Sequence, residues 1–148
     1  MLMNEDDLQV FIDGIIHYFD QMSGERPIVD TPYLKDEEDV VMDFTGVIGI
    51  SGRSKGAIYF TAMQELLKEL IRSTGHDDFS QEMLGDMVGE VANTLSGNAR
   101  KEFGANFMIS VPVVIVGRAG IKMPTSIRTF VIPIIWRANK SYLIVCLE

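Results

Sequence analysis

Three strand-like runs follow residue 104 with only short connections between them, and this limits the topologies open to the chain. They read NFMISVPVVIVG (106–117), SIRTFVIPIIW (126–136) and SYLIVCLE (141–148). Parallel neighbours need a crossover of about a dozen residues or more, usually a helix, and these connections are shorter. The runs are therefore predicted to pair antiparallel, with RANKS (137–141) as a hairpin turn.

An earlier pair of β-rich runs, in VVMDFTGVIGISGRSKGAIYFTA (40–62), is separated by SGRSKG and predicts another hairpin. The glycines also suggest a phosphate-binding loop, but the Gly-Lys-Ser/Thr ending is missing and no helix follows directly. Between residues 24 and 39, Pro27 and Pro32 restrict any strand to a sheet edge or a loop.

Three helices are predicted from apolar spacings of three and four residues. The first covers residues 5–23 after Asn4 as N-cap. The second begins with a capping box of Thr61 and Gln64, buries Leu66, Leu67, Leu70 and Ile71, and stops at Gly75. The third spans 81–103 and is the longest.

The third helix has strong end signals. Ser80 is the predicted N-cap, and Phe79 is placed to pack on Leu84. Arg100 and Lys101 suit the negative end of the helix dipole, and Gly104 suits a left-handed C-cap. Because helices and strands do not alternate regularly, we predict an α+β fold, an antiparallel-rich β-sheet packed with about three helices in one domain, residues 1–148.

Composition narrows the function classes. A formal net charge of −8 with scattered Lys and Arg argues against nucleic acid as a partner. No apolar run approaches the roughly 18 residues of a membrane span, and the N-terminus is acidic, so we expect no membrane insertion and a cytoplasmic protein. Cys146 is alone, and His17 and His76 lack partners at metal-ligand spacing, so no metal site is predicted.

One polar line on the third helix needs an explanation. In DMVGEVANTLSGNAR, Asp86, Glu90 and Asn93 share a face, opposite the apolar Leu84, Val88, Val91 and Leu95. Gly89 and Gly97 flank the line, although a helical glycine costs about 1 kcal/mol relative to alanine. The pattern leaves two interpretations open: a solvated face whose glycines admit a neighbouring element, or an exposed surface that binds a partner.

At these residues the sequence resembles the CheC/CheX/FliY family of chemotaxis phosphatases. The family's motif is Asp or Ser, three residues, Glu, two residues and Asn, which Asp86, Glu90 and Asn93 match. The likeness extends to the glycine-marked hairpin before FTAMQELL and to VPVVIVG, and covers about residues 40–147. The single motif resembles the CheX branch, whose members are typically homodimers, and implies a CheX-like fold.

The resemblance implies a phosphatase that hydrolyses the aspartyl phosphate of a response regulator such as CheY. Asn93 would orient the attacking water and Glu90 would dock on the regulator's active-site lysine. Asp86, Gly89 and Gly97 would form partner-binding surface. The protein would need no cofactor of its own, because Mg²⁺ would be bound by the phosphorylated regulator.

Two other classes of function fit the same helix. A non-catalytic binding module would dock on a receiver domain or signalling complex without accelerating hydrolysis. A structural subunit of a flagellar or signalling assembly would bind no receiver domain and would need an obligate assembly partner.

Overall fold

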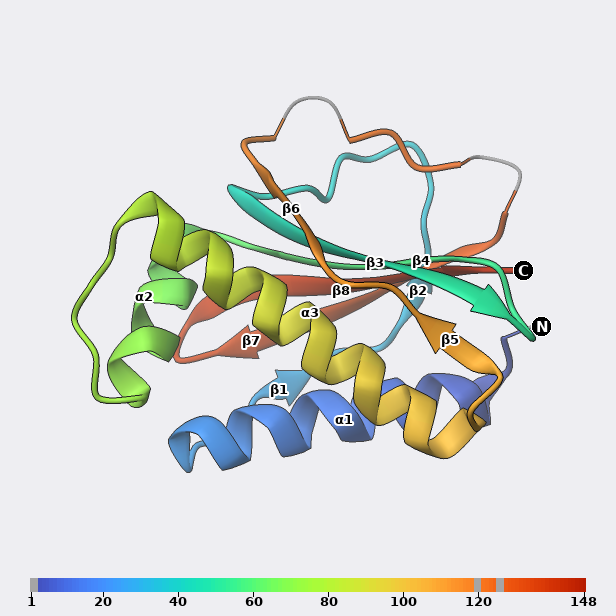
Figure 1. The fold of residues 1–148 in the computed structure, drawn as a ribbon, viewed down its shortest axis with the longest axis horizontal. Helices are drawn as coiled ribbons and strands as arrows, with labels where there is room; N and C mark the ends of the chain where they lie inside the picture. The colour runs from blue at the N-terminus through green and yellow to red at the C-terminus, as the bar shows by residue number, and fades with distance from the viewer. Residues whose placement is uncertain (1–2, 119–120, 125–126) are drawn as a thin grey trace.

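A computed structural model describes residues 3–118, 121–124 and 127–148, which form three helices and one eight-stranded sheet (Figure 1). The elements in chain order are α1 (Glu5–Ser23), β1 (Ile28–Val29), β2 (Tyr33–Leu34), β3 (Phe44–Gly52), β4 (Gly56–Ala62), α2 (Gln64–Ser73), α3 (Gln81–Phe103), β5 (Phe107–Ile109), β6 (Val113–Val116), β7 (Thr129–Trp136) and β8 (Asn139–Leu147). This arrangement confirms the predicted α+β class and the three helices.

All strand pairings of the described sheet are antiparallel. The strand order is β1-β7-β8-β4-β3-β5, with β2 also paired to β7 and β6 also paired to β3. The predicted hairpins β3–β4 and β7–β8 are confirmed. The predicted pairing of the run 106–117 with the runs that follow it is wrong, because this run forms β5 and β6, which both pair antiparallel with β3. The proline-marked segment supplies only the two-residue strands β1 and β2 at the β7 edge, as the prolines required.

The three helices cover one face of the sheet, and long connections lie on the other side (Figure 1). Alternate strand residues face the helices and form the main core, whose fully buried members include Ile48, Ile58, Phe60, Ile132 and Leu143. A smaller apolar cluster occupies the opposite face and contains Val40, Tyr59, Val131, Ile144 and Cys146. Both faces are therefore apolar, which explains why β7 and β8 show little alternation in sequence.

The predicted capping box of α2 is wrong. Thr61 lies within β4 and is fully buried, and its Oγ1 accepts a hydrogen bond from Met42 N at 2.8 Å. The N-cap of α2 is Met63, which makes no side-chain cap. Instead, Gln64 N donates to Asp43 Oδ2 at 3.2 Å. A carboxylate distant in sequence thus satisfies the first turn of this helix.

The bounds of α3 agree with the prediction at both ends. Ser80 caps the helix through a hydrogen bond from Met83 N, at 3.3 Å. Gly104 ends it and donates its N–H to Arg100 O at 2.8 Å. However, Gly104 has φ 101° and ψ 170°, so its predicted left-handed C-cap conformation is wrong in ψ.

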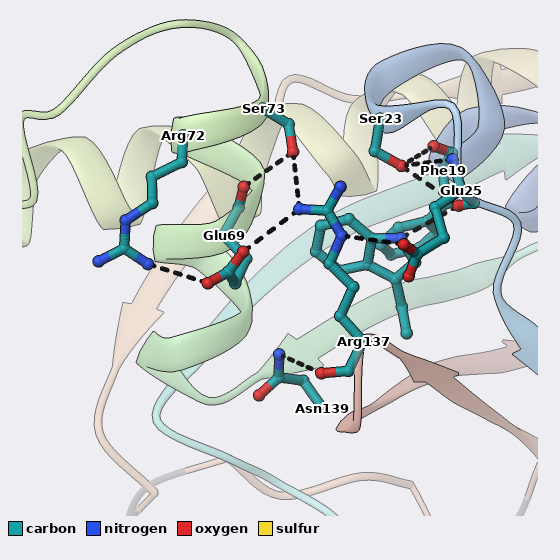
Figure 2. A network of polar contacts seen from close by, with 9 residues as sticks. Phe19, Ser23, Glu25, Glu69, Arg72, Ser73, Arg137 and Asn139 are labelled. Carbon is teal, nitrogen blue, oxygen red and sulfur yellow. Dashed lines mark hydrogen bonds and ion pairs between the residues drawn. The ribbon is translucent and has the colours of Figure 1, made fainter.

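The β7–β8 turn ties together the end of the molecule that carries α2. Arg137 and Ala138 both have positive φ, 50° and 62°, as a tight two-residue hairpin requires. Figure 2 shows how the Arg137 guanidinium lies between Glu25, after α1, at 3.5 Å and Glu69, on α2, at 3.2 Å. It also lies 4.4 Å from the Trp136 ring centroid. These contacts link the hairpin to both helical segments.

Candidate functional site

The polar line sits on a helix that is held closely against the sheet. Gly46 of β3 lies directly beneath α3, and a Cβ added there would be 2.7 Å from Val88 O and 3.0 Å from Ala92 Cβ. Only a glycine admits the helix backbone at this separation. Direct contact with the β3 backbone therefore holds α3 at a fixed distance from the sheet. The side chains on the outer face of α3 are held in place with it.

The outer face carries the predicted motif. Asp86, Glu90 and Asn93 are all exposed, whereas the opposite side of the helix is buried through Leu84, Val88, Val91 and Leu95. The four ion pairs within the described residues use Glu25, Asp43 and Glu69 as their acids, and none uses Asp86 or Glu90. The motif carboxylates are therefore available to cations of another molecule.

Helix α1 flanks the motif on one side. The side chain of Tyr18 is buried, with its hydroxyl 4.0 Å from Met87 Sδ. Burial raises the pKa of Tyr18, and the negative charge of Glu90 raises it further. Tyr18 of α1 therefore lies close enough to Glu90 for the two side chains to interact electrostatically.

Strand β6 flanks the motif on the other side, and this explains Gly89. A Cβ at Gly89 would lie 3.1 Å from Val114 Cγ2, and one at Gly85 would lie 3.3 Å from Val114 Cγ1. Gly89 is buried. For this glycine the structure favours close approach of a neighbouring element, which was one of the two interpretations. Gly85 was not predicted to have a role, although it lies four residues before Gly89 and therefore on the same face of the helix.

Gly97 has a different environment. It is half-buried, and a Cβ added there would meet nothing within 4 Å. No packing contact of the described residues explains this glycine. Its place in the partner-binding surface, together with Asp86, therefore stays a prediction.

Two further properties bear on the chemistry. No group of three or more His, Cys, Asp or Glu side chains in the described residues is placed to hold a metal ion. None of the helices within the same residues has the length and apolar content needed to cross a membrane. The exposed face of α3 presents the Asn93 amide and the carboxylates of Asp86 and Glu90, with β6 beside it.

Comparison with known proteins identifies similar chains. The family model for the chemotaxis phosphatase CheX matches residues 44–135, while no curated protein matches the sequence. CheX from Desulfovibrio desulfuricans is 29% identical with a TM-score of 0.82, covering 97% of this chain and 99% of its own. A putative chemotaxis protein from Desulfovibrio vulgaris Hildenborough is 28% identical with a TM-score of 0.84, covering 100% of both chains.

A more distant structure shares the fold. It is the CheX-CheY-BeF3-Mg²⁺ complex from Borrelia burgdorferi, which aligns at 19% identity with a TM-score of 0.77 and covers 98% of this chain and 99% of its own. The matched family model spans β3 to β7 and includes the whole of α3. The resemblance first seen in the α3 motif is thereby confirmed.

Proposed function

The chain belongs to the CheX family of chemotaxis phosphatases, and on that premise we propose that it accelerates hydrolysis of the aspartyl phosphate on a CheY-like receiver domain. The observation that carries the proposal is the exposure of Glu90 and Asn93, less than one helical turn apart, on a helix seated by backbone contact on the sheet. Such a helix can insert both side chains into a partner's pocket without rearranging.

In this proposal Asn93 orients the attacking water molecule. Its carbonyl oxygen accepts a hydrogen bond from a water molecule, and its NH₂ group donates towards the phosphoryl oxygens. The water oxygen attacks phosphorus in line, the bond from phosphorus to the acyl oxygen breaks, and the regulator's aspartate leaves as a carboxylate with release of inorganic phosphate. An amide is too weak a base to take the proton, so the rate gain comes from positioning the water and excluding others.

In this proposal Glu90 binds the receiver domain. The receiver's phosphorylation pocket contains a lysine, according to the family resemblance, and a carboxylate that meets it forms a charge-assisted hydrogen bond. The absence of Glu90 from the ion pairs of the described residues leaves it available for this contact.

The Borrelia burgdorferi complex supports the choice of partner. That CheX was crystallised with CheY, BeF3 and Mg²⁺, and it shares the fold of this chain. In our proposal the Mg²⁺ is bound by the regulator, and this protein brings no cofactor. We also propose that the protein acts in the cytoplasm as a homodimer, as the resemblance to the CheX branch implies.

The test is the rate of phosphate release from a phosphorylated CheY-like receiver with and without this protein, in Mg²⁺ buffer. We expect substoichiometric protein to accelerate release. Binding without acceleration would instead select the non-catalytic module. Failure to bind any receiver, with an obligate partner recovered from the cell, would select the structural subunit.

Glu90→Gln is expected to weaken engagement of the receiver without changing the rate within the complex. Glutamine can still accept a hydrogen bond but carries no charge, and because a charge-assisted hydrogen bond is roughly twice as strong as a neutral one, the half-saturating concentration should rise by about threefold to tenfold. A titration of the acceleration measures both quantities. Glu102→Gln, also exposed on α3, is the control. An unchanged half-saturating concentration for Glu90→Gln would contradict the docking role.

Gly97→Ala is expected to stabilise the protein while weakening its engagement of the receiver. Alanine favours a helix by about 1 kcal/mol over glycine, and the space at Gly97 is open. Gly89→Ala is the matched comparison, because its Cβ would press on Val114 and offset that gain. Denaturant unfolding and the titrated acceleration measure the two effects. Unchanged engagement by Gly97→Ala would remove this glycine from the partner-binding surface.

A further inference from the structure

We propose that the groove between α3 and β6 docks an apolar side chain of the receiver domain that has a lysine or arginine beside it. The groove has a volume of about 390 Å³ and is lined by Gln81, Glu82, Gly85, Asp86, Val114 and Val116. This inference rests on the proposed function and adds the second contact region and the chemistry that it recognises.

The groove follows from how β6 pairs with β3. Val114 lies opposite Gly46 and Val116 opposite Phe44, and Gly46 lies directly beneath α3. Successive side chains of a strand point to opposite faces, so Val114 and Val116 lie on the helix side while Val113 lies on the other. Gly85 and Gly89 let the Val114 end of the strand approach α3. The groove remains between Val116 and the first turns of the helix.

Its apolar wall is exposed in the isolated chain. Val114 is 38% exposed and Val116 49% exposed, and both side chains lie on the helix side of β6. Exposed apolar side chains that line a groove in this way are suited to contact a partner. An apolar side chain of the partner is the group that this wall would bury.

The opposite wall is acidic. Glu82 and Asp86 are exposed, and neither takes part in the four ion pairs of the described residues. Asp86 lies one helical turn before Glu90, so the groove continues directly into the proposed docking contact. A partner whose lysine reaches Glu90 therefore lies within about one helical turn of the groove, where a second cation of that partner would meet Glu82 or Asp86.

Charge also argues against a second copy of this chain as the occupant. The formal net charge is −8, and a symmetric contact through the groove would bring the acidic walls of both copies towards each other. Unpaired like charges at an interface oppose association. A receiver surface with an apolar residue flanked by a cation avoids this repulsion, because its cation is attracted to the acidic wall.

The experiment measures binding of a BeF3-activated, Mg²⁺-loaded CheY-like receiver to Val116→Lys and to Val113→Lys, beside the unmodified protein. Both valines lie on β6 and are similarly exposed, at 49% and 59%, but only Val116 lines the groove. Lysine at 116 fills the groove and repels the partner's cation. We expect its dissociation constant to rise about tenfold and that of Val113→Lys to change less than twofold. Thermal unfolding and sedimentation are recorded for each protein.

Every outcome of this experiment either supports or overturns the docking role of the groove. Equal weakening by the two variants, or weakening by neither, overturns it. A change in sedimented mass for Val116→Lys, with receiver binding intact, would assign the groove to a second copy and also overturn it. Receiver binding that depends on Val116 without acceleration of hydrolysis would support the groove while refuting the proposed phosphatase. Absence of receiver binding by the unmodified protein would overturn both.

Discussion

Replacing Asn93 with alanine is expected to abolish the acceleration of phosphate release, a loss of about 100-fold or more in the rate within the complex. The reason is that alanine removes both the acceptor for the attacking water and the donor towards the phosphoryl group. Binding should change little, because Glu90 and the apolar edge of β6 remain. The measurement is phosphate release from the receiver at saturating concentrations of the variant.

Asn98→Ala is the matched control. This variant removes the same type of side chain from the same helix. Asn98, however, is half-buried and lies towards α1: a Cβ added at Gly14 would be 3.8 Å from Asn98 Cβ. We expect this variant to accelerate release like the unmodified protein. Retained acceleration by Asn93→Ala, with an unchanged circular dichroism spectrum, would show that the water is positioned by another group.

Gly46→Ala is expected to destabilise the protein more than any of the substitutions on the exposed face of α3. The added Cβ would lie 2.7 Å from Val88 O, a backbone atom that cannot turn aside, so α3 must shift away from β3. Overpacking of this kind costs about 1–3 kcal/mol. The motif face moves with the helix, so acceleration should fall as well. Denaturant unfolding and phosphate release measure the two effects.

Gly49→Ala, on the same strand, controls for the substitution itself. Its Cβ would meet Ser110 Oγ at 3.4 Å, an ordinary van der Waals contact. Replacing glycine by alanine without strain stabilises a protein by about 0.4–1 kcal/mol through the unfolded chain. A similar stability for the two variants would mean that α3 does not depend on close approach at Gly46.

The predictions that succeeded rest on signals within a few residues of one another. The ends of α3 were predicted from Ser80 and from the basic last turn before Gly104, because caps satisfy backbone groups locally. Antiparallel pairing was predicted from the short connections after residue 104, which leave no room for a crossover helix. This is confirmed for β7 and β8, whereas β5 and β6 pair antiparallel with the distant β3. The exposed line through Asp86, Glu90 and Asn93 was predicted from helical periodicity.

The capping box failed for a reason that the local pattern does not contain. Thr61 and Gln64 have the spacing of a capping box, but β4 continues through Thr61 because it pairs with both β3 and β8. Thr61 is consequently buried, and Asp43 takes over part of the capping. Pairing with two neighbouring strands outweighed a cap worth about 1 kcal/mol.

The fold class, the bounds of the motif helix and the residues on its exposed face can be predicted from the chain alone, because they depend on periodicity and on neighbours along the chain. What lies beside that face depends on contacts between distant segments. β6 reaches α3 through its pairing with β3, and this places Val114 against Gly85 and Gly89 and opens the groove beside Asp86. Residues far apart along the chain meet there through sheet register, which no local pattern in the chain encodes.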